Sequence, residues 1–299
     1  MTTARRLADD YLDDLCRLDP IFGSYVGDVD ARTRLPDFSP EGAGERAHAA
    51  RLALTALASA SRDTVEDESA ALLLQDRLSI TLDQFEAGSH LRALSVIGSP
   101  VGTIRAAFDN MPIATDQDWE AVIERLEAVP TAYASLRRSY EHGLDRGVVA
   151  AARQANACAE QAEQWAGMHG ATPWFESFAS KGPDALRVRL DRAARAATAS
   201  VGELGAYLRQ VYAPAVAHVP DAAGAERYEL GVRQFLGAEL DIDEAYEWAW
   251  HELARIEDEM RRRRREIVPG ASIAEAMAHL DAEGEAVEAP TPCATGSSN

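Results

Sequence analysis

The feature that most constrains the fold is an apolar stripe at helical spacing near the end of the chain. Six apolar residues recur there at intervals of three and four: Ala245, Trp248, Ala249, Leu253, Ile256 and Met260. This spacing places them on one face of an amphipathic helix. Asp241 or Asp243 can cap its start, and Arg261 to Arg265 lie near its carboxyl end, where the helix dipole favours cations. Pro269-Gly270 ends this helix, and a capping box from Ser272 to Glu275 begins another.

The pattern stops abruptly after Asp281. The remaining sequence, AEGEAVEAPTPCATGSSN, has no period and few apolar residues. Too little apolar surface is available there to offset the entropy cost of ordering. We therefore expect a helical domain over residues 1–281, incomplete at its C-terminus, and a disordered tail over residues 282–299.

Helical patterns also occupy most of the preceding chain, and the fold class is predicted to be all-α with about ten helices. They cover residues 4–19, 40–59, 65–87, 104–110, 116–129, 130–146, 148–166, 183–213 and 226–236. Each is bounded by capping residues, prolines or glycines. No convincing strand, glycine-rich phosphate loop or internal repeat is found.

Four finer predictions concern single segments, and three of them depend on local breakers. Residues 19–42 hold three glycines and three prolines and should form the longest irregular segment. Pro130 should begin a new helix at its tolerated first position. Gly202 to Gly205 is a possible helix break. The loop ATPWFESF is aromatic-rich, and its rings are more typical of core packing than of a ligand platform.

Composition excludes some partners. The chain has 299 residues, 46% of them hydrophobic, which is enough for a core. Its net charge of -19 argues against a nucleic acid or an anionic membrane as partner. Cys16, Cys158 and Cys293 have neither disulfide-framework nor zinc-knuckle spacing, and no signal peptide or membrane-length apolar run is found. We expect a cytoplasmic protein.

One local sequence resembles part of a zinc-peptidase motif. In HExxH, two histidines one helical turn apart bind the metal, and the glutamate is the general base. Here His251-Glu252 is followed by Arg255 at the position of the second histidine, so the motif fails. We interpret His251 as a surface residue of the helix.

The other titratable residues form no specific motif. His169 and His279 are isolated, and His142 lies near a predicted helix end, where histidine commonly interacts with free carbonyls. No GxSxG elbow is present. Several carboxylates are expected on solvated helix faces: Glu160, Glu163, Glu176, Asp243 and Glu244. No catalytic, metal-binding or cofactor-binding residue is assigned, and the substrate-binding residues are unknown.

Three long segments resemble the bacterial domain-of-unknown-function family 885 (DUF885). They are DPIFGSYVGDVDARTRLPDFSPEG, FDNMPIATDQDWEAVIERLEAVPTAYASLRRSYEHG and FLGAELDIDEAYEWAWHELARIEDEMRRRRREIVPGASIAEAMAHLD. The similarity runs from about residue 10 to Asp281. That family is similar to helical zinc peptidases of the gluzincin kind, whose metal motif is His-Glu-x-x-Pro-Gly-His with a later glutamate ligand.

The resemblance implies the N-terminal helical half of such a peptidase. The family's metal motif lies downstream of the segment that matches Met277–Asp281, so no residue here inherits a zinc ligand or the general base. Zinc is expected only in full-length relatives. We favour a truncated or frameshifted gene over a genuine short protein, because a half-domain should expose an apolar face.

Two functions remain open. The chain is either the inactive N-terminal part of a zinc-dependent peptidase, whose partner would be the missing catalytic half, or a non-enzymatic helical scaffold that binds a protein partner or its own copy.

Overall fold

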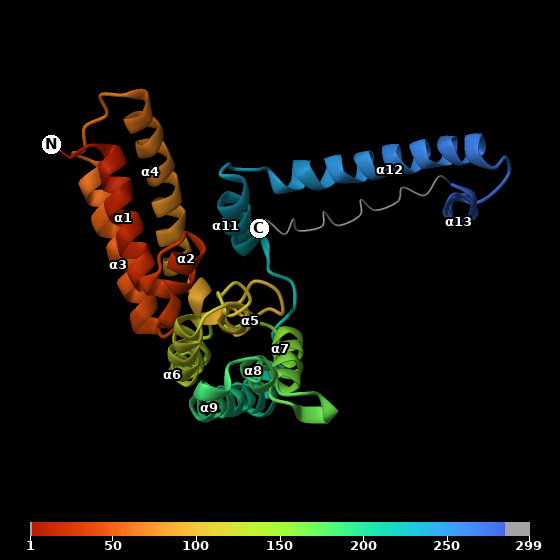
Figure 1. The fold of residues 1–299 in the computed structure, drawn as a ribbon. Coiled ribbons are helices and arrows are strands. Elements are labelled where there is room, and N and C mark those ends of the chain that lie inside the picture. The colour runs from red at the N-terminus through yellow and green to blue at the C-terminus, as the bar shows by residue number, and fades with distance from the viewer. Residues whose placement is uncertain (1, 285–299) are drawn as a thin grey trace, which may run out of the picture. The chain divides into compact units, whose positions relative to one another are not determined.

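The computed structural model describes residues 2–284, and contacts divide the chain into two units, residues 1–239 and 240–299 (Figure 1). Within the described residues, every extended regular element is a helix. A single isolated bridge joins Thr3 and Ser61. The all-α prediction is therefore confirmed.

Three long helices open the first unit: α1 (Ala4–Leu18), α3 (Pro40–Leu57) and α4 (Val65–Glu86). Each begins at a hydroxyl side chain, Thr3, Ser39 or Thr64, that accepts a hydrogen bond from a backbone N–H of the first turn. The three helices contact one another and lie side by side in Figure 1. The predicted helices at 4–19, 40–59 and 65–87 are thus confirmed to within two residues.

The main core of the first unit lies around α6 (Asp116–Arg146), α7 (Ala152–Trp165) and α9 (Arg187–Tyr207). Helix α9 contacts both α6 and α7, and the short α8 (Trp174–Ala179) contacts α9 (Figure 1). The short elements of this unit are α2 (Pro20–Tyr25), η1 (Asp30–Thr33), η2 (Ser89–Arg92), α5 (Pro100–Ala106), η3 (Met168–Gly170), η4 (Asp184–Leu186), η5 (Leu208–Tyr212), α10 (Ala213–Ala215) and α11 (Ala225–Leu236).

Helix α6 corrects the prediction that Pro130 begins a new helix. Its start at the Thr115–Asp118 capping box and its end at left-handed Gly147 are as predicted, but Pro130 lies inside one continuous helix. Proline removes one backbone hydrogen bond and crowds the preceding turn. Val129 and Tyr133 are buried on either side of it. Packing of these side chains in the core offsets the local cost and keeps the helix intact.

Helix α9 likewise runs through Gly202 and Gly205 without the predicted break. A Cβ atom at Gly205 would lie 3.2 Å from the Cβ of Ala162 on α7. A Cβ atom at Gly202 would lie 3.2 Å from the Cβ of Ala166, which directly follows α7. The glycines therefore allow two helices to approach closely. The irregularity comes later, where η5 is a π-helix of residues 208–212.

Residues 19–42 are more regular than predicted. Asp19 caps α2 by accepting a hydrogen bond from the Phe22 N–H at 3.1 Å, and Pro20 occupies the first helical position. The 3-10 helix η1 follows. The Asp-Pro pair is a helix-start signal that the abundance of breakers concealed.

The second unit contains α12 (Ile242–Ile267) and α13 (Ile273–Glu283). The predicted Asp241 cap and the Ser272–Glu275 capping box are both present. Ala276 is the one buried residue among those described in this unit. The predicted disordered tail, residues 282–299, starts too early, because α13 continues to Glu283. Residues 285–299, with Cys293, lie outside the described part of the chain.

Candidate functional site

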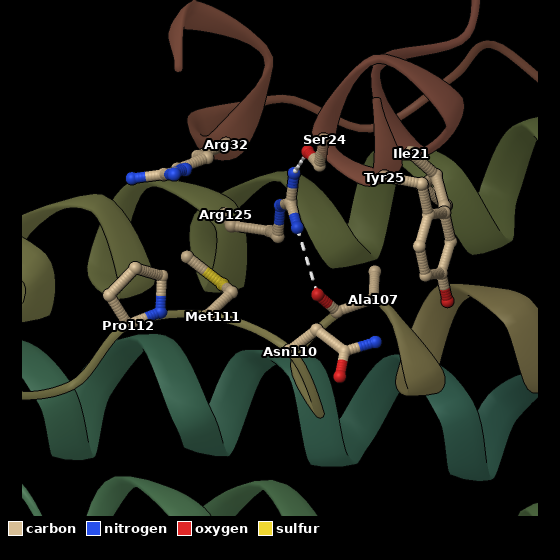
Figure 2. A pocket seen from close by; sticks show the side chains of 9 residues that line it. All are labelled: Ile21, Ser24, Tyr25, Arg32, Ala107, Asn110, Met111, Pro112 and Arg125. Atoms are coloured by element: carbon tan, nitrogen blue, oxygen red, sulfur yellow. Dashed lines mark hydrogen bonds between the residues drawn. The ribbon is translucent and has the colours of Figure 1, made fainter. Parts of the chain in front are cut away.

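A pocket lies in the first unit, where α2, η1 and the turn after α5 meet α6 (Figure 2). Its cavity volume is about 60 Å³. Its lining residues are Ile21, Ser24, Tyr25, Arg32, Ala107, Asn110, Met111, Pro112 and Arg125. The pocket combines apolar side chains with two arginines, which fits a small polar ligand.

Arg125 is the central side chain of this pocket. It is 1% exposed. As Figure 2 shows, its guanidinium lies between Ser24 and the Ala107 carbonyl: Nη1 donates to Ala107 O at 2.9 Å and Nη2 donates to Ser24 Oγ at 2.6 Å. Nη2 also donates to Ala31 O at 2.8 Å. Arg125 therefore joins α2, η1 and the end of α5 to α6.

Burial is the main cause that lowers the pKa of Arg125 to about 10, and the nearby positive charge of Arg32 lowers it further. The guanidinium is therefore still charged at neutral pH. No carboxylate of the described residues lies within 4 Å of it. Its charge is met only by the dipoles of two carbonyls and a hydroxyl.

Sequence reasoning missed Arg125, although a signal exists. Arg125 follows Val122 by three residues and precedes Val129 by four, and both are fully buried. In a helix these positions share one face. A cation in the apolar stripe of residues 116–146 could have been selected as a candidate, since charged residues are rarely buried without a reason.

A second polar group of the first unit contains Glu163, Arg209 and His169. Arg209 donates to Glu163 through Nε at 2.6 Å and Nη2 at 2.8 Å, and His169 Nε2 lies 3.3 Å from Glu163 Oε2. These hydrogen bonds, that of Arg209 above all, hold the pKa of Glu163 below its ordinary value.

The expectation that Glu163 lies on a solvated face is therefore wrong: it is 6% exposed. Its partner Arg209 belongs to the π-helix η5, and His169 has a left-handed backbone at φ 58°. Such irregularities often accompany functional positions. Glu160, Asp243 and Glu244 are exposed as predicted.

The failed HExxH segment is an ordinary surface turn of α12. His251 is exposed, as predicted. Arg255 makes a two-fold hydrogen bond to Glu252, with Nε and Nη2 each 2.7 Å from a carboxylate oxygen. This contact lowers the pKa of Glu252. The donor set thus does not fit zinc, and within residues 2–284 no three His, Cys, Asp or Glu side chains gather as a metal site would require.

The aromatic segment packs into the core, as predicted. Phe175 is fully buried, and Trp174 and Phe178 stack with centroids 5.3 Å apart. All three rings contact Phe108, and Arg105 lies 4.3 Å from the centroid of Trp174. The three residues belong to helix α8, where the sequence had predicted a loop.

Within the second unit, α13 leaves the apolar side chains of α12 largely uncovered. No residue of α12 is buried. Its large apolar side chains are 40–64% exposed: Tyr246, Trp248, Trp250, Leu253, Ile256 and Met260. A run of this kind on an exposed helix is typical of a surface that binds another polypeptide.

Comparison with known proteins places the chain in a family. A model described as "Bacterial protein of unknown function (DUF885)" matches residues 20–292, eleven residues beyond Asp281. No curated protein matches this chain. Among the described residues, no helix is long and apolar enough to cross a bilayer.

Two solved structures share the fold, both of proteins described as a putative lipoprotein. The one from Shewanella oneidensis, of unknown function, is 16% identical with a TM-score of 0.66, and the match covers 94% of this chain and 52% of that protein. The one from Colwellia psychrerythraea is 15% identical with a TM-score of 0.64, covering 95% and 55%. The chain thus spans about half the length of these structures.

Proposed function

Because this chain belongs to DUF885, a bacterial family of unknown function, we propose that it is the helical, non-metal-binding part of a larger assembly. In this assembly the apolar face of α12 packs against another polypeptide segment. The carrying observation is that face, where side chains such as Tyr246 and Leu253 are 63% and 45% exposed. Covering one such side chain fully contributes about 1.5–3 kcal/mol, so several together supply a strong driving force.

We propose further that the assembly is a zinc-dependent peptidase. Support comes from the resemblance of DUF885 to gluzincin-like peptidases and from the solved neighbours, which extend over about twice the matched length. Zinc would be held by a segment with His-Glu-x-x-Pro-Gly-His, since the donors around His251 do not fit the metal. No step of peptide hydrolysis is therefore assigned to residues 2–284.

Co-expression tests this proposal. The chain would be produced with and without a second polypeptide that carries the His-Glu-x-x-Pro-Gly-His segment of a DUF885 relative. Zinc would be counted by mass spectrometry, and peptidase activity assayed on a mixed peptide library. We expect zinc and activity only in the complex. Stoichiometric zinc in the chain alone would contradict the proposal.

Two matched variants test the role of α12. Leu253→Glu places a charge in the apolar stripe, whereas His251→Glu places the same charge about 200° away around the helix axis. Both residues are exposed, so neither variant should unfold the chain. We expect Leu253→Glu to abolish co-purification with the second polypeptide and His251→Glu to preserve it. Equal behaviour of the two variants would exclude the stripe as the contact surface.

A scaffold that binds its own copy is the second candidate. Tyr246, Leu253 and Met260 are spaced by seven residues, with Ala249 and Ile256 between them, which is the spacing of paired helices. Light scattering of the purified chain without any partner separates the two functions. A concentration-dependent dimer that Leu253→Glu dissociates favours the scaffold, and a monomer favours the two-part peptidase.

We also propose that the protein acts in the cytoplasm. Cys16 and Cys158 are buried and carry free thiols, as is common in a reducing compartment. Cell fractionation with an antibody to the chain is the direct test. Recovery with the membrane or the periplasm would contradict this location.

A further inference from the structure

The positive charge of buried Arg125 is not balanced by a nearby negative charge. It is the one buried arginine among residues 2–284. A buried cation is costly unless an opposite charge compensates it, and here neutral acceptors lessen the cost without removing the charge. Its Nε is shielded from solvent and has no acceptor, whereas nearly all buried donors find one.

Arg32 adds a second positive charge to the same pocket. It is half-buried and lines the same pocket as Arg125, and in Figure 2 its guanidinium is turned away from that of Arg125. It also has no carboxylate within 4 Å among the described residues. Two guanidinium groups that border one small space repel each other, and an anion between them would turn this repulsion into attraction.

The remaining walls limit the chemistry of the anion. Met111 and Pro112 present hydrocarbon to the pocket. An adjoining hollow shares these two residues and Arg32 and adds Asp30 and Asp118. These carboxylates would repel an anion with several charges, such as a phosphate. A singly charged group with an attached hydrocarbon chain fits both the cations and the apolar wall.

We propose that this pocket binds a small carboxylate that bears an apolar group, with the carboxylate between Arg32 and Arg125. The ligand could be a free acid or the carboxyl end of a peptide, which share this chemistry. Met111 has a flexible thioether side chain that can shift to admit the ligand. The site lies within the first unit and does not involve α12, so its test is separate from that of the proposed assembly.

Calorimetric titration of the full chain tests the proposal with four probes. Isovalerate represents a free acid, and N-acetyl-leucine represents a peptide carboxyl end. N-acetyl-leucinamide has the same shape without the charge, and inorganic phosphate has the charge without the hydrocarbon. We expect at least one of the two carboxylates to bind, with roughly tenfold or greater preference over the amide and over phosphate. Which carboxylate binds more tightly identifies the source.

Two arginine variants complete the test. Arg32→Ala should weaken carboxylate binding roughly tenfold, because it removes one of the two charges. Arg195→Ala removes the same charge from an exposed position on α9 and should leave binding unchanged. Circular dichroism and urea unfolding of both variants verify that the fold is intact. Equal binding of acid and amide, equal effects of the two variants, tighter phosphate binding or no binding of either carboxylate would each overturn the proposal.

Discussion

Helices α6 and α12 have similar patterns and opposite surroundings. Both are long amphipathic helices, of 31 and 26 residues, with a capped start. Helix α6 buries its apolar stripe and even Arg125, whereas α12 buries no residue. Helix α12 instead carries exposed ion pairs between its arginines and glutamates three or four positions away. One helix is held by tertiary packing and the other by local contacts.

Core truncation should separate the two helices most clearly. Leu126 on α6 is fully buried, and Leu253 on α12 is 45% exposed. We expect Leu126→Ala to lower the free energy of unfolding by about 2–5 kcal/mol because it leaves a cavity. The matched Leu253→Ala should change it by no more than about 0.5 kcal/mol. Denaturant unfolding of both variants measures the difference, and similar losses would refute the contrast.

Glycine substitution tests how tightly α6 is packed. A Cβ atom at Gly143 would lie 2.7 Å from Val148 O and 2.8 Å from Leu91 O. Since both contacts are backbone atoms that cannot move aside cheaply, Gly143→Ala should destabilise the chain by about 1–3 kcal/mol. Gly44 in α3 has no atom within 4 Å of the same point. There, Gly44→Ala should stabilise by about 0.5–1 kcal/mol, and a loss in thermal unfolding would contradict this reading.

The buried carboxylate of Glu163 predicts an acid-dependent loss of stability in the first unit. Arg209 lowers its folded-state pKa, so its contribution is present above the unfolded pKa of about 4.3 and is lost as pH falls through the lower folded value. Because the Arg209 side chain is 42% exposed, we expect Glu163→Gln to cost only about 1 kcal/mol at neutral pH. The loss should shrink on acidification in urea titrations. Exposed Glu160 supplies the control, and equal pH profiles for Glu160→Gln and Glu163→Gln would contradict the assignment.

The smallest effect should be that of the ion pairs on α12. Arg255 and Arg263 donate hydrogen bonds that lower the pKa values of Glu252 and Glu259. Their support for the helix is therefore present at neutral pH and lost as acid protonates both glutamates below their ordinary range. A peptide of residues 240–284 should lose helical circular dichroism on acidification and, to a lesser degree, in molar salt. Unchanged helicity under both conditions would mean that these pairs do not hold the helix.

The sequence did not predict the candidate pocket, whereas it did predict the exposed apolar face of α12. The stripe from Ala245 to Met260 and an unpartnered apolar face follow from periodicity and from the DUF885 resemblance. The pocket requires residues from α2, η1 and α6, separated by about a hundred positions, to meet at Arg125. Periodicity contains no information about which distant segments meet.

The sequence by itself determined where most helices begin and end, because caps such as Thr115 and Gly147 act on residues within one turn. It also determined the all-α class and the amphipathic faces. Only the tertiary structure decided that Pro130 stays inside α6, that Gly205 allows α7 to approach α9, and that Glu163 is buried. The physical reason is that packing between distant residues contributes more free energy than the local preferences that such residues express, and it can therefore override them.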